Sequence, residues 1–387
     1  MIKKKLLILG VSGSIGKQTA EVVAEHPDLF EITAVSAGVN VAGLPAIIKD
    51  YQPAMICVAK YQDYQCLRSH YHNVKWFYGE DGLKEIVKQA DYDLLVNALS
   101  GFVGVVPTVE AIKREKDVAL ANKESLVVAG NLINELKRLH KVEIRPIDSE
   151  HSALWQCLQG NELKAVKRVI ITASGGSFRD YSRCELDKVT VSEALRHPNW
   201  SMGAKITIDS ATMMNKCFEV VEAHHLFGFK EKQLEVILHP QSIVHSLVEY
   251  VDGALIAQLG NPDMRVPIQY ALTWPKRYPL KQDNEFELSK LEFRPLDTER
   301  FPFISLARKI IREGDSLGCV VNAADEVAVD AFLKGQISFL AIETIVFMAV
   351  EAFTGIITLS LEDLINLDTE VRNFVRKEIA EGMRKTK

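Results

Sequence analysis

The chain has 387 residues, of which 47% are hydrophobic and 25% charged, so it is long enough for two or three ordinary globular domains. The net charge of −5 provides no basic surface for nucleic acid, and no apolar run approaches the roughly 20 residues of a membrane-spanning helix. The six cysteines are scattered without a C-x-x-C pair, which argues against a zinc ribbon or a disulfide framework and predicts reduced thiols in a cytoplasmic protein.

The first predicted strand, residues 5–9, leads into a glycine-rich turn, Gly10-Val11-Ser12-Gly13-Ser14-Ile15-Gly16, and then into a helical pattern that reaches about Glu25. This order is typical of a dinucleotide site, because glycines permit the tight turn and the N–H groups of the helix N-terminus bind the pyrophosphate. The spacing is G-x-x-G-x-x-G rather than the stricter G-x-G-x-x-G. A plain strand–helix turn is therefore the alternative interpretation.

The end of the second predicted strand, residues 31–36, bears on the choice of cofactor. An NAD site usually carries an acidic residue there, which binds the ribose 2′-hydroxyl. Here the chain continues as Ala37-Gly38-Val39-Asn40, without a carboxylate. The absence favours NADP over NAD, although no Arg or Lys stands in this stretch to pair with a 2′-phosphate.

Strands predicted at residues 55–58, 94–98 and 117–120 alternate with helices at 82–89 and 107–113, which indicates a doubly wound parallel sheet. The strand at 117–120 ends in Ala121-Asn122-Lys123-Glu124-Ser125. Ligands bind beyond the carboxyl ends of such strands. Lys123 is accordingly either a solvated loop residue or a fixed cation that faces substrate oxygens.

The sequence Asp148-Ser149-Glu150-His151 stands between a predicted strand at residues 142–147 and a predicted helix at 152–158. Two carboxylates and a hydroxyl suit a hard divalent cation, which prefers oxygen ligands. The same residue types are also common at a helix N-terminus, where they accept backbone N–H bonds. Both interpretations stay open on this stretch alone.

Two loops follow. After a strand at residues 166–172, the small residues Ala173-Ser174-Gly175-Gly176-Ser177 form either an anion-binding nest or an ordinary flexible turn. Residues 195–203 are irregular and carry His197 and Trp200, which is typical of an active-site lid. A structural Trp that anchors the loop is the competing interpretation.

A strand is predicted at residues 205–209, with Ser210 as the N-cap of a helix that reaches about Leu226. Ser210, Asn215 and Lys216 near that N-terminus could hold a phosphate, and Glu219, one turn further, could complete a metal site with Asp148 and Glu150. A solvated polar helix face is the alternative. Glu219, Glu222 and His225 also mimic one helix of a di-iron carboxylate protein, but that architecture needs further such helices.

The remainder predicts a hairpin from residues 244–250 and 254–260, a linker from Trp274 to Pro295 and packed rather than ligating roles for His239 and His245. Helices at residues 304–313, 322–333, 339–353 and 360–383 form a C-terminal bundle, for which we expect structural support and no chemistry.

With these motifs in hand, the chain closely resembles the 1-deoxy-D-xylulose 5-phosphate reductoisomerase family over essentially its whole length. The likeness rests on six motifs in family-like order: Gly13-Ser14-Ile15-Gly16, Ala121-Asn122-Lys123-Glu124-Ser125, Asp148-Ser149-Glu150-His151, Ser174-Gly175-Gly176, the stretch from His197-Pro198-Asn199-Trp200 to Gly203, and Asp209-Ser210-Ala211-Thr212-Met213-Met214-Asn215-Lys216 with Glu219. Each motif is modest alone, but the six together are highly specific.

The resemblance implies a cytoplasmic enzyme of the non-mevalonate isoprenoid pathway, usually a homodimer, that depends on NADPH and on a divalent cation (Mg²⁺, Mn²⁺ or Co²⁺). It would rearrange the carbon skeleton of 1-deoxy-D-xylulose 5-phosphate by retro-aldol cleavage and re-addition. NADPH would then reduce the resulting aldehyde to 2-C-methyl-D-erythritol 4-phosphate.

The resemblance also assigns the site residues. The metal ligands would be Asp148, Glu150 and Glu219. Ser149 and Lys123 would contact substrate oxygens, Trp200 would lie in the lid, and the phosphate side would be held by Ser174, His197, Ser210, Asn215 and Lys216. The residues at the cofactor would be Ser12, Gly13, Ser14, Ile15, Gly38, Asn40, Asn122, Glu124 and Gly203.

Some positions depart from the family pattern. Ser12 replaces a more frequent Thr, Val39 stands where a basic residue is often found, and Ala173 and Ser177 replace a common Gly and Pro around the nest. None is a proposed metal ligand, but Val39 puts the contact to the 2′-phosphate in question.

The expected fold is α/β in four parts: an N-terminal Rossmann-like parallel sheet that binds NADPH (1–149), a central α+β catalytic domain (150–273, lid near 195–204), a linker (274–300) and a C-terminal helical bundle (301–387). Two other classes stay open. An ordinary NADP-dependent dehydrogenase would need no set of three carboxylates, and a silent binding protein would have no use for the intact Lys123, Asp148, Glu150 and Glu219.

Overall fold

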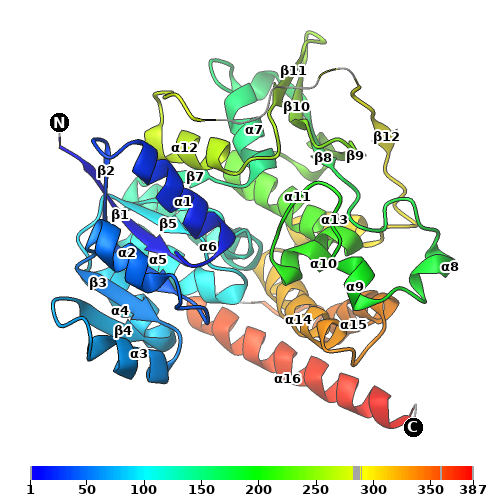
Figure 1. The fold of residues 1–387 in the computed structure, drawn as a ribbon. Coiled ribbons are helices and arrows are strands. Elements are labelled where there is room, and N and C mark those ends of the chain that lie inside the picture. The colour runs from blue at the N-terminus through cyan, green and yellow to red at the C-terminus, as the bar shows by residue number, and fades with distance from the viewer. Residues whose placement is uncertain (1, 282–287, 289, 358–359, 386–387) are drawn as a thin grey trace. The chain divides into compact units, whose positions relative to one another are not determined.

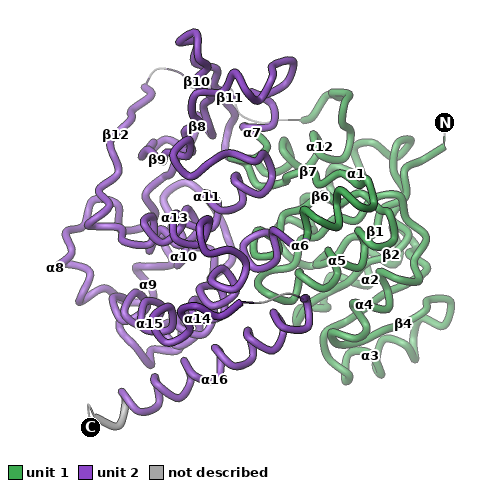
Figure 2. The backbone as a smooth tube through the Cα atoms, turned by 180° about the vertical axis from the view of Figure 1, so that it is seen from behind, with its two compact units in different colours: residues 1–125, 133–152, 263–283 green, residues 126–132, 153–262, 284–387 purple. Residues whose placement is uncertain are grey.

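The computed structural model describes residues 2–281, 288, 290–357 and 360–385, with helices and parallel and antiparallel strands along the whole described chain (Figure 1). Backbone contacts divide it into two compact units (Figure 2). Unit 1 comprises residues 1–125, 133–152 and 263–283, and unit 2 comprises residues 126–132, 153–262 and 284–387. None of the described helices combines the length and the apolar character that a bilayer crossing requires.

Unit 1 is built on a parallel sheet with the strand order β4-β3-β2-β1-β5-β6-β7. The strands are β1 (Lys4–Leu9), β2 (Phe30–Ala37), β3 (Met55–Val58), β4 (Lys75–Tyr78), β5 (Leu94–Asn97), β6 (Asp117–Leu120) and β7 (Ile144–Pro146). They are near-continuous apolar runs because a parallel sheet is covered on both faces. The doubly wound sheet predicted from the alternating pattern is confirmed.

The helices of unit 1 connect these strands and cover the sheet. They are α1 (Ser14–Glu25), α2 (Leu44–Tyr51), α3 (Tyr61–Arg68), α4 (Gly79–Gln89), the 3₁₀ turn η1 (Phe102–Gly104), α5 (Val105–Lys113) and α12 (Arg265–Thr273). Two further helices, α6 (Glu124–His140) and α7 (Ser149–Cys157), contain residues of both units. Helix α6 is kinked at Ala129, whose φ of −136° and ψ of 29° are not helical.

The strand register sets the edge where ligands can bind. Leu9 at the end of β1 pairs with Ser36 of β2 on one side and with Asn97 of β5 on the other. The order of strands along the chain reverses between β1 and β5, so the loop after β1 leaves the sheet at its topological switch point.

Unit 2 contains a mixed sheet with the order β11-β10-β8-β9-β12. The strands are β8 (Val166–Ala173), β9 (Leu234–Leu238), β10 (Val244–Tyr250), β11 (Leu255–Leu259) and β12 (Arg294–Pro295). Strands β8 and β9 are parallel, and the other pairs are antiparallel. The predicted hairpin is confirmed as β10 and β11.

The helices of unit 2 fall into two sets. The short elements η2 (Leu163–Ala165), α8 (Arg183–Leu186), α9 (Val191–Ala194) and η3 (Glu231–Gln233) stand beside two longer helices, α10 (Ala204–Thr212) and α11 (Met214–Phe227). The C-terminal set is α13 (Phe303–Glu313), α14 (Asp315–Leu333), α15 (Phe339–Ala352) and α16 (Leu361–Lys385). Helix α14 packs against both α15 and α16, which confirms the predicted bundle.

The contact-based units differ from the expected domain boundaries at residues 263–283. The expected boundaries assign this segment to the catalytic domain and the linker, whereas α12 packs against α1 and against β6 and β7 in unit 1. Ile268, Ala271 and Leu272 are fully buried in the core of the N-terminal sheet, and the Lys4 Nζ donates a hydrogen bond of 2.7 Å to the Leu272 carbonyl. Part of the expected linker, residues 282–287 and 289, lies outside the described residues.

Candidate active site

The glycine turn of unit 1 is shaped by two close backbone approaches. Gly10 has a φ of +85°, and a Cβ at Gly16 would lie 2.2 Å from the Gly10 carbonyl oxygen. The amides of Gly10 and Val11 donate to the Ser36 carbonyl at 3.1 and 2.8 Å, which ties the turn to β2. Helix α1 then starts at Ser14 with no side-chain cap at Gly13, so its first N–H groups are available to an anion. The turn therefore fits a pyrophosphate.

The loop after β2 is open. Val39 is 70% exposed, Asn40 is exposed with its Oδ1 accepting from the Ala42 amide at 3.1 Å, and a Cβ at Gly38 would meet nothing within 4 Å. The loop leaves space for a bulky group, and Val39 supplies no charge. A cofactor contact of Gly38 and Asn40 stays a prediction.

Asn122 links two loops of unit 1 through hydrogen bonds of its side chain. Its side chain is fully buried, and its Nδ2 donates to the carbonyls of Leu99 and Gly101 at 3.1 and 3.0 Å and to Glu124 Oε2 at 2.8 Å. These bonds tie the end of β6 to the loop after β5. The contacts of Asn122 and Glu124 with a cofactor stay a prediction.

Lys123 and Asp148 meet because they follow neighbouring parallel strands, β6 and β7. The Lys123 Nζ lies 2.7 Å from Asp148 Oδ2, and the Nδ1 of the buried His151 lies 3.1 Å from Asp148 Oδ1. Burial acts to raise the pKa of Asp148, but Lys123 and His151 outweigh it and hold that pKa well below its usual range. The carboxylate therefore stays ionised, as a metal ligand must be.

The neighbouring residues begin α7, which starts three residues earlier than the predicted helix at 152–158. The Glu150 amide donates to Asp148 Oδ1 at 3.3 Å, and the Ser149 hydroxyl donates to Glu150 Oε2 at 2.6 Å. Asp148 is thus both the acceptor at a helix start and one of two adjacent carboxylates with oxygen donors for a hard cation.

In unit 2, the loop after β8 has the geometry of an anion nest. Gly175 and Gly176 have φ values of +86° and +68°, and the Gly176 amide donates to Ser174 Oγ at 3.2 Å. A Cβ at Gly176 would lie 2.6 Å from the Ser210 carbonyl oxygen and 2.7 Å from Ala211 Cα. The loop is therefore pressed against the backbone of α10, and Ser174 and Ser210 belong to one local structure.

His197 faces this loop as a neutral donor. Its Nδ1 accepts the amides of Asn199 and Trp200 at 3.2 and 3.0 Å, so the ring proton is on Nε2, which lies 3.0 Å from Ser174 Oγ. Burial, aided by the charge of Arg179, lowers the pKa of His197 to about 4. At neutral pH the ring therefore offers one N–H to an anion without carrying a charge.

The predicted lid is irregular between α9 and α10 and lies against the start of β10. The Asn199 Nδ2 donates to the Pro240 carbonyl at 2.6 Å and to Ser242 Oγ at 2.7 Å, and the centroids of the Trp200 and His245 rings are 6.3 Å apart. Gly203 is the N-cap of α10, and a Cβ there would meet nothing within 4 Å. Lid movement and a cofactor contact of Gly203 stay predictions.

The strand predicted at residues 205–209 is wrong, because these residues form α10. Ser210 is consequently not an N-cap but stands near the end of α10. Met213, with φ 66° and ψ 12°, breaks the helix, and α11 begins at Met214. Asn215 and Lys216 therefore still occupy the first turn of a helix, as an anion site requires.

The polar residues of α11 are not a solvated face. Glu219 is 1% exposed, Glu222 is 0% exposed and His225 is 7% exposed. Glu219 accepts a hydrogen bond of 2.6 Å from Asn215 Nδ2 and forms an ion pair with Lys216. Glu219 belongs to unit 2, whereas Asp148 and Glu150 belong to unit 1, so their joint action stays a prediction.

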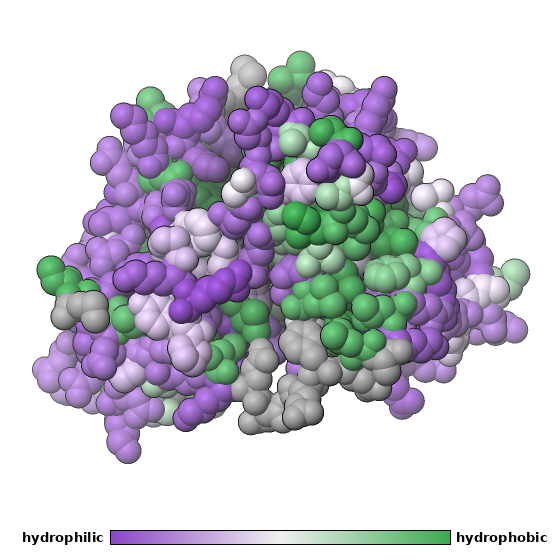
Figure 3. Space-filling view, turned by 90° about the horizontal axis from the view of Figure 1, so that it is seen from above, coloured by the Kyte–Doolittle hydropathy of each residue, from purple (hydrophilic) through white to green (hydrophobic). Residues whose placement is uncertain are grey.

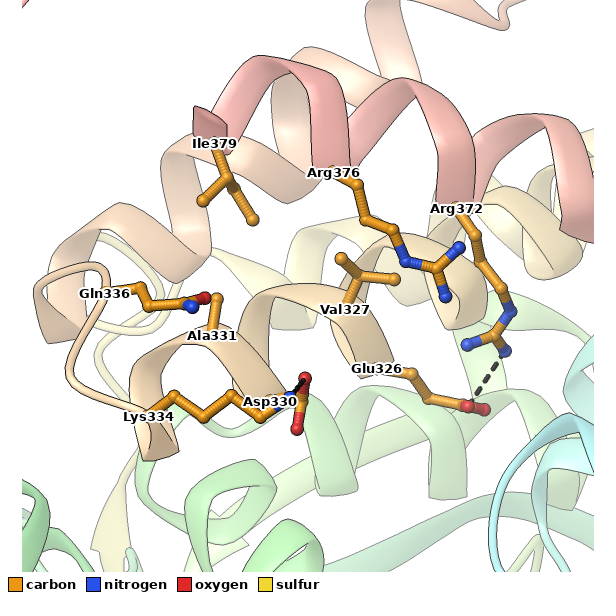
Figure 4. A pocket seen from close by; sticks show the side chains of 9 residues that line it. All are labelled: Glu326, Val327, Asp330, Ala331, Lys334, Gln336, Arg372, Arg376 and Ile379. Atoms are coloured by element: carbon orange, nitrogen blue, oxygen red, sulfur yellow. Dashed lines mark hydrogen bonds and ion pairs between the residues drawn. The ribbon is translucent and has the colours of Figure 1, made fainter. Parts of the chain in front are cut away.

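An open pocket of about 570 Å³ in the C-terminal bundle offers less chemistry (Figure 4). It is lined by residues of α14 and α16 and by the segment that follows α14. Its charges are largely matched, since Arg372 bonds to Glu326 at 2.8 Å and Lys334 to Asp330 at 2.6 Å. We find no nucleophile or uncompensated charge cluster among its lining residues, Glu326, Val327, Asp330, Ala331, Lys334, Gln336, Arg372, Arg376 and Ile379.

The sequence interpretation missed one polar cluster, in which Lys205 lies between Asp209 and Asp325. Lys205 and Asp209 are four residues apart, a spacing that pairs charges on a helix but not on the strand that we predicted. Asp325 lies in α14, where we expected no chemistry.

Three family models match the chain: 1-deoxy-D-xylulose 5-phosphate reductoisomerase over residues 6–130, the C-terminal domain of the same enzyme over 144–227, and a further DXP reductoisomerase C-terminal domain over 259–374. A relative of that name from Bacillus cereus (strain Q1) is 49% identical over 379 residues, which are 97% of this chain and 100% of the relative. Another from Geobacillus sp. (strain WCH70) is 51% identical over 377 residues, 96% of this chain and 99% of the relative.

Solved structures agree with the sequence relatives. A DOX-P reductoisomerase in complex with NADPH, fosmidomycin and magnesium superposes with a TM-score of 0.92 at 38% identity, over 97% of this chain and 98% of that one. The 1-deoxy-D-xylulose 5-phosphate reductoisomerase from Zymomonas mobilis, in complex with NADPH, gives a TM-score of 0.89 at 39% identity, over 98% and 99% of the two chains.

Proposed function

Because this chain belongs to the 1-deoxy-D-xylulose 5-phosphate reductoisomerase family, we propose that it converts 1-deoxy-D-xylulose 5-phosphate to 2-C-methyl-D-erythritol 4-phosphate with NADPH and magnesium. The observation that carries the proposal is that the full-length likeness coincides with an intact set of chemical groups. The glycine turn, the Lys123–Asp148 pair and the Ser174–His197 nest are all present. An ordinary dehydrogenase needs only the first of these.

We assign the metal ligands to Asp148, Glu150 and Glu219. When bound, magnesium supplies Lewis-acid polarisation of the substrate's oxygens. Within unit 1, Lys123 keeps Asp148 ionised from 2.7 Å away, and its positive charge is assigned to the oxyanions that develop on the substrate. The Ser149 hydroxyl, beside Glu150, is assigned to a substrate oxygen. His151 orients Asp148 and is left outside the ligand set.

The phosphate of the substrate is assigned to unit 2. Ser174, His197, Ser210, Asn215 and Lys216 supply hydroxyl, imidazole, amide and ammonium donors around the Gly175–Gly176 turn and the first turn of α11. His197 fits this role because its proton is on Nε2. Remote binding energy of this kind orients the reacting end of the substrate, and closure of the Trp200 lid would exclude water from it.

The cofactor is assigned to the switch point of the unit 1 sheet. The residues assigned to it are Ser12, Gly13, Ser14, Ile15, Gly38, Asn40, Asn122 and Glu124, with Gly203 from the end of the lid. Bound NADPH supplies the hydride for the reduction. The protein's part is to hold the pyrophosphate at the uncapped start of α1 and to accept the 2′-phosphate in the open loop at Val39.

We further propose a cytoplasmic homodimer, in which a second copy covers the β10–β11 hairpin. Strand β11 is an edge strand, and Val251, Leu255 and Ile256 at this hairpin are 69%, 54% and 40% exposed. Figure 3, in which the molecule of Figure 1 is seen from above, shows hydrophobic residues gathered on the upper face. Exposed apolar edge strands favour pairing with another chain.

The variant Ile256→Lys should therefore shift the mass measured by light scattering from dimer to monomer. Leu139→Lys, at another exposed leucine, is the control.

The test of the activity is NADPH consumption with 1-deoxy-D-xylulose 5-phosphate, followed at 340 nm with magnesium and again after chelation. We expect turnover that stops with the chelator and returns with added magnesium. Turnover that survives chelation, or no turnover with this substrate at any magnesium concentration, would contradict the proposal.

A further inference from the structure

The ammonium of Lys205 joins three helices of unit 2. It stands in the first turn of α10, 2.5 Å from Asp209 Oδ2 of the same helix and 2.8 Å from Asp325 Oδ2 of α14. It also lies 5.6 Å from the centroid of the buried Phe218 ring of α11. Helices α10, α11 and α14 are neighbours in the fold, so the cluster lies at their junction (Figure 1).

Stability alone is a weak reason for such a cluster. Asp209 is 4% exposed and Asp325 is 0% exposed, and burying a carboxylate costs several kcal/mol unless a partner compensates for it. Well-packed apolar side chains of similar volume are often as stable as a buried ion pair. The cluster instead fixes orientation, because an ion pair with short, directional hydrogen bonds holds two helices in one relative position.

Helix α10 is held at both of its ends. Lys205 ties its first turn to α14, and five residues later, about 7.5 Å along a helix axis, the Ser210 carbonyl is pressed against Gly176. The Met213 break then starts α11, with Asn215 and Lys216 in its first turn. The phosphate donors on the two helices thus depend on where α10 lies.

We propose that Asp325 is a positioning residue for the phosphate-binding residues: through Lys205 it fixes α10 and the start of α11, and so places Ser210, Asn215 and Lys216. The assignment of phosphate as the ligand rests on the proposed function. Asp325 itself touches no substrate. It acts from the C-terminal helices, which therefore take part in substrate binding.

The variant Asp325→Leu removes the bond to Lys205 and leaves Lys205 paired with Asp209. We expect two constants to rise together by about tenfold: the KM for 1-deoxy-D-xylulose 5-phosphate, and the Kd for inorganic phosphate, which calorimetry measures. A tenfold change corresponds to the loss of about one charge-assisted hydrogen bond. The Kd for NADPH, measured without substrate, should change less than the Kd for phosphate, because eight of the nine residues assigned to the cofactor lie in unit 1 and only Gly203 adjoins α10. Asp330→Asn is the matched control, since Asp330 lies on the same helix in an exposed pair with Lys334.

A folded Asp325→Leu protein with the wild-type Kd for inorganic phosphate overturns the proposal. If that variant fails to fold, Asp325→Asn takes its place. Its amide oxygen still accepts a bond from Lys205, so we expect a rise of about threefold in the same two constants, and unchanged constants overturn the proposal. Because phosphate binding needs no turnover, a wild-type protein that binds phosphate but does not convert the substrate contradicts the proposed function and leaves this inference testable.

Hydrogen exchange on the wild-type protein tests the same link without a mutation. Saturation with inorganic phosphate should slow exchange in residues 204–212 of α10 and also around Asp325 in α14, but not near Lys334. Slowed exchange in α10 without any change around Asp325 overturns the proposal.

Discussion

Replacement of Gly176 by Ala tests whether the nest after β8 and helix α10 form one phosphate-binding structure. The φ of Gly176 is +68°, and the new Cβ would lie 2.6 Å from the Ser210 carbonyl oxygen. Ordinary contact begins at 3.4 Å, so the loop and α10 must separate by 3.4 − 2.6 = 0.8 Å. Both sides of this contact are backbone, and no flexible side chain can move aside.

The magnitude has two parts. A non-glycine residue in the left-handed region costs about 1–2 kcal/mol of folding free energy. A shift of about 0.8 Å would lengthen a charge-assisted bond from about 2.8 Å to about 3.6 Å, beyond hydrogen-bonding distance. Losing one such bond costs about 1.5–3 kcal/mol, so we expect the KM for the substrate to rise about 10- to 100-fold.

Gly160 provides the matched control. Its φ is +78°, but a Cβ there would meet nothing within 4 Å. Gly160→Ala should therefore lose about 1–2 kcal/mol in urea unfolding and keep the wild-type KM, whereas Gly176→Ala should lose more and also bind substrate and inorganic phosphate weakly. Equal KM values for the two variants would refute the reasoning, because the contact with Ser210 would then have no effect on the site.

Three further outcomes are expected. Asp148→Asn and Glu219→Gln should each abolish turnover while NADPH binding, followed by fluorescence, is kept; a near-normal kcat at saturating magnesium would remove these residues from the ligand set. Despite Val39, the enzyme should prefer NADPH to NADH, and equal kcat/KM values for the two cofactors would show that it has no site for a 2′-phosphate. In the folded state the pKa of His197 is lowered to about 4, below the ordinary value of 6.5. The unfolded chain therefore binds the proton at a higher pH than the folded protein does, and folding stability is lost as the pH falls from 6.5 toward 4. The difference in urea midpoint between pH 7.5 and pH 5 should accordingly be smaller in His197→Gln than in the wild type, and an unchanged difference would argue that His197 is not buried as described.

The sequence predicts the N-terminal sheet well because its pattern is local. The strands at 55–58 and 117–120 are short apolar runs between polar connections, and both are found with the predicted bounds. The loops that follow such strands carry Lys123 and Asp148, so neighbouring parallel strands bring these residues together without any long-range information.

The errors come from long-range packing. Residues 205–209 alternate polar and β-branched side chains like a strand, yet they form a helix. The spacing of Lys205 and Asp209 is a local signal for the helix, but the second partner of Lys205, Asp325, is 120 residues away, and no local pattern reveals it. The polar face of α11 stays open in the sequence for a related reason. A metal-binding face and a solvated face have the same local pattern, and the burial of Glu219 and Glu222 depends on what packs over the helix.

The return of α12 to the N-terminal unit affects how the chain folds during synthesis. The last strand of that sheet ends at Pro146, yet Ile268 and Leu272 complete its core. A nascent chain that has emerged only to residue 150 therefore exposes apolar sheet surface, and it must keep that surface from aggregating while more than a hundred further residues are made. An isolated fragment that ends at 150 would carry the same liability, and a soluble cofactor-binding domain needs the α12 segment supplied with it.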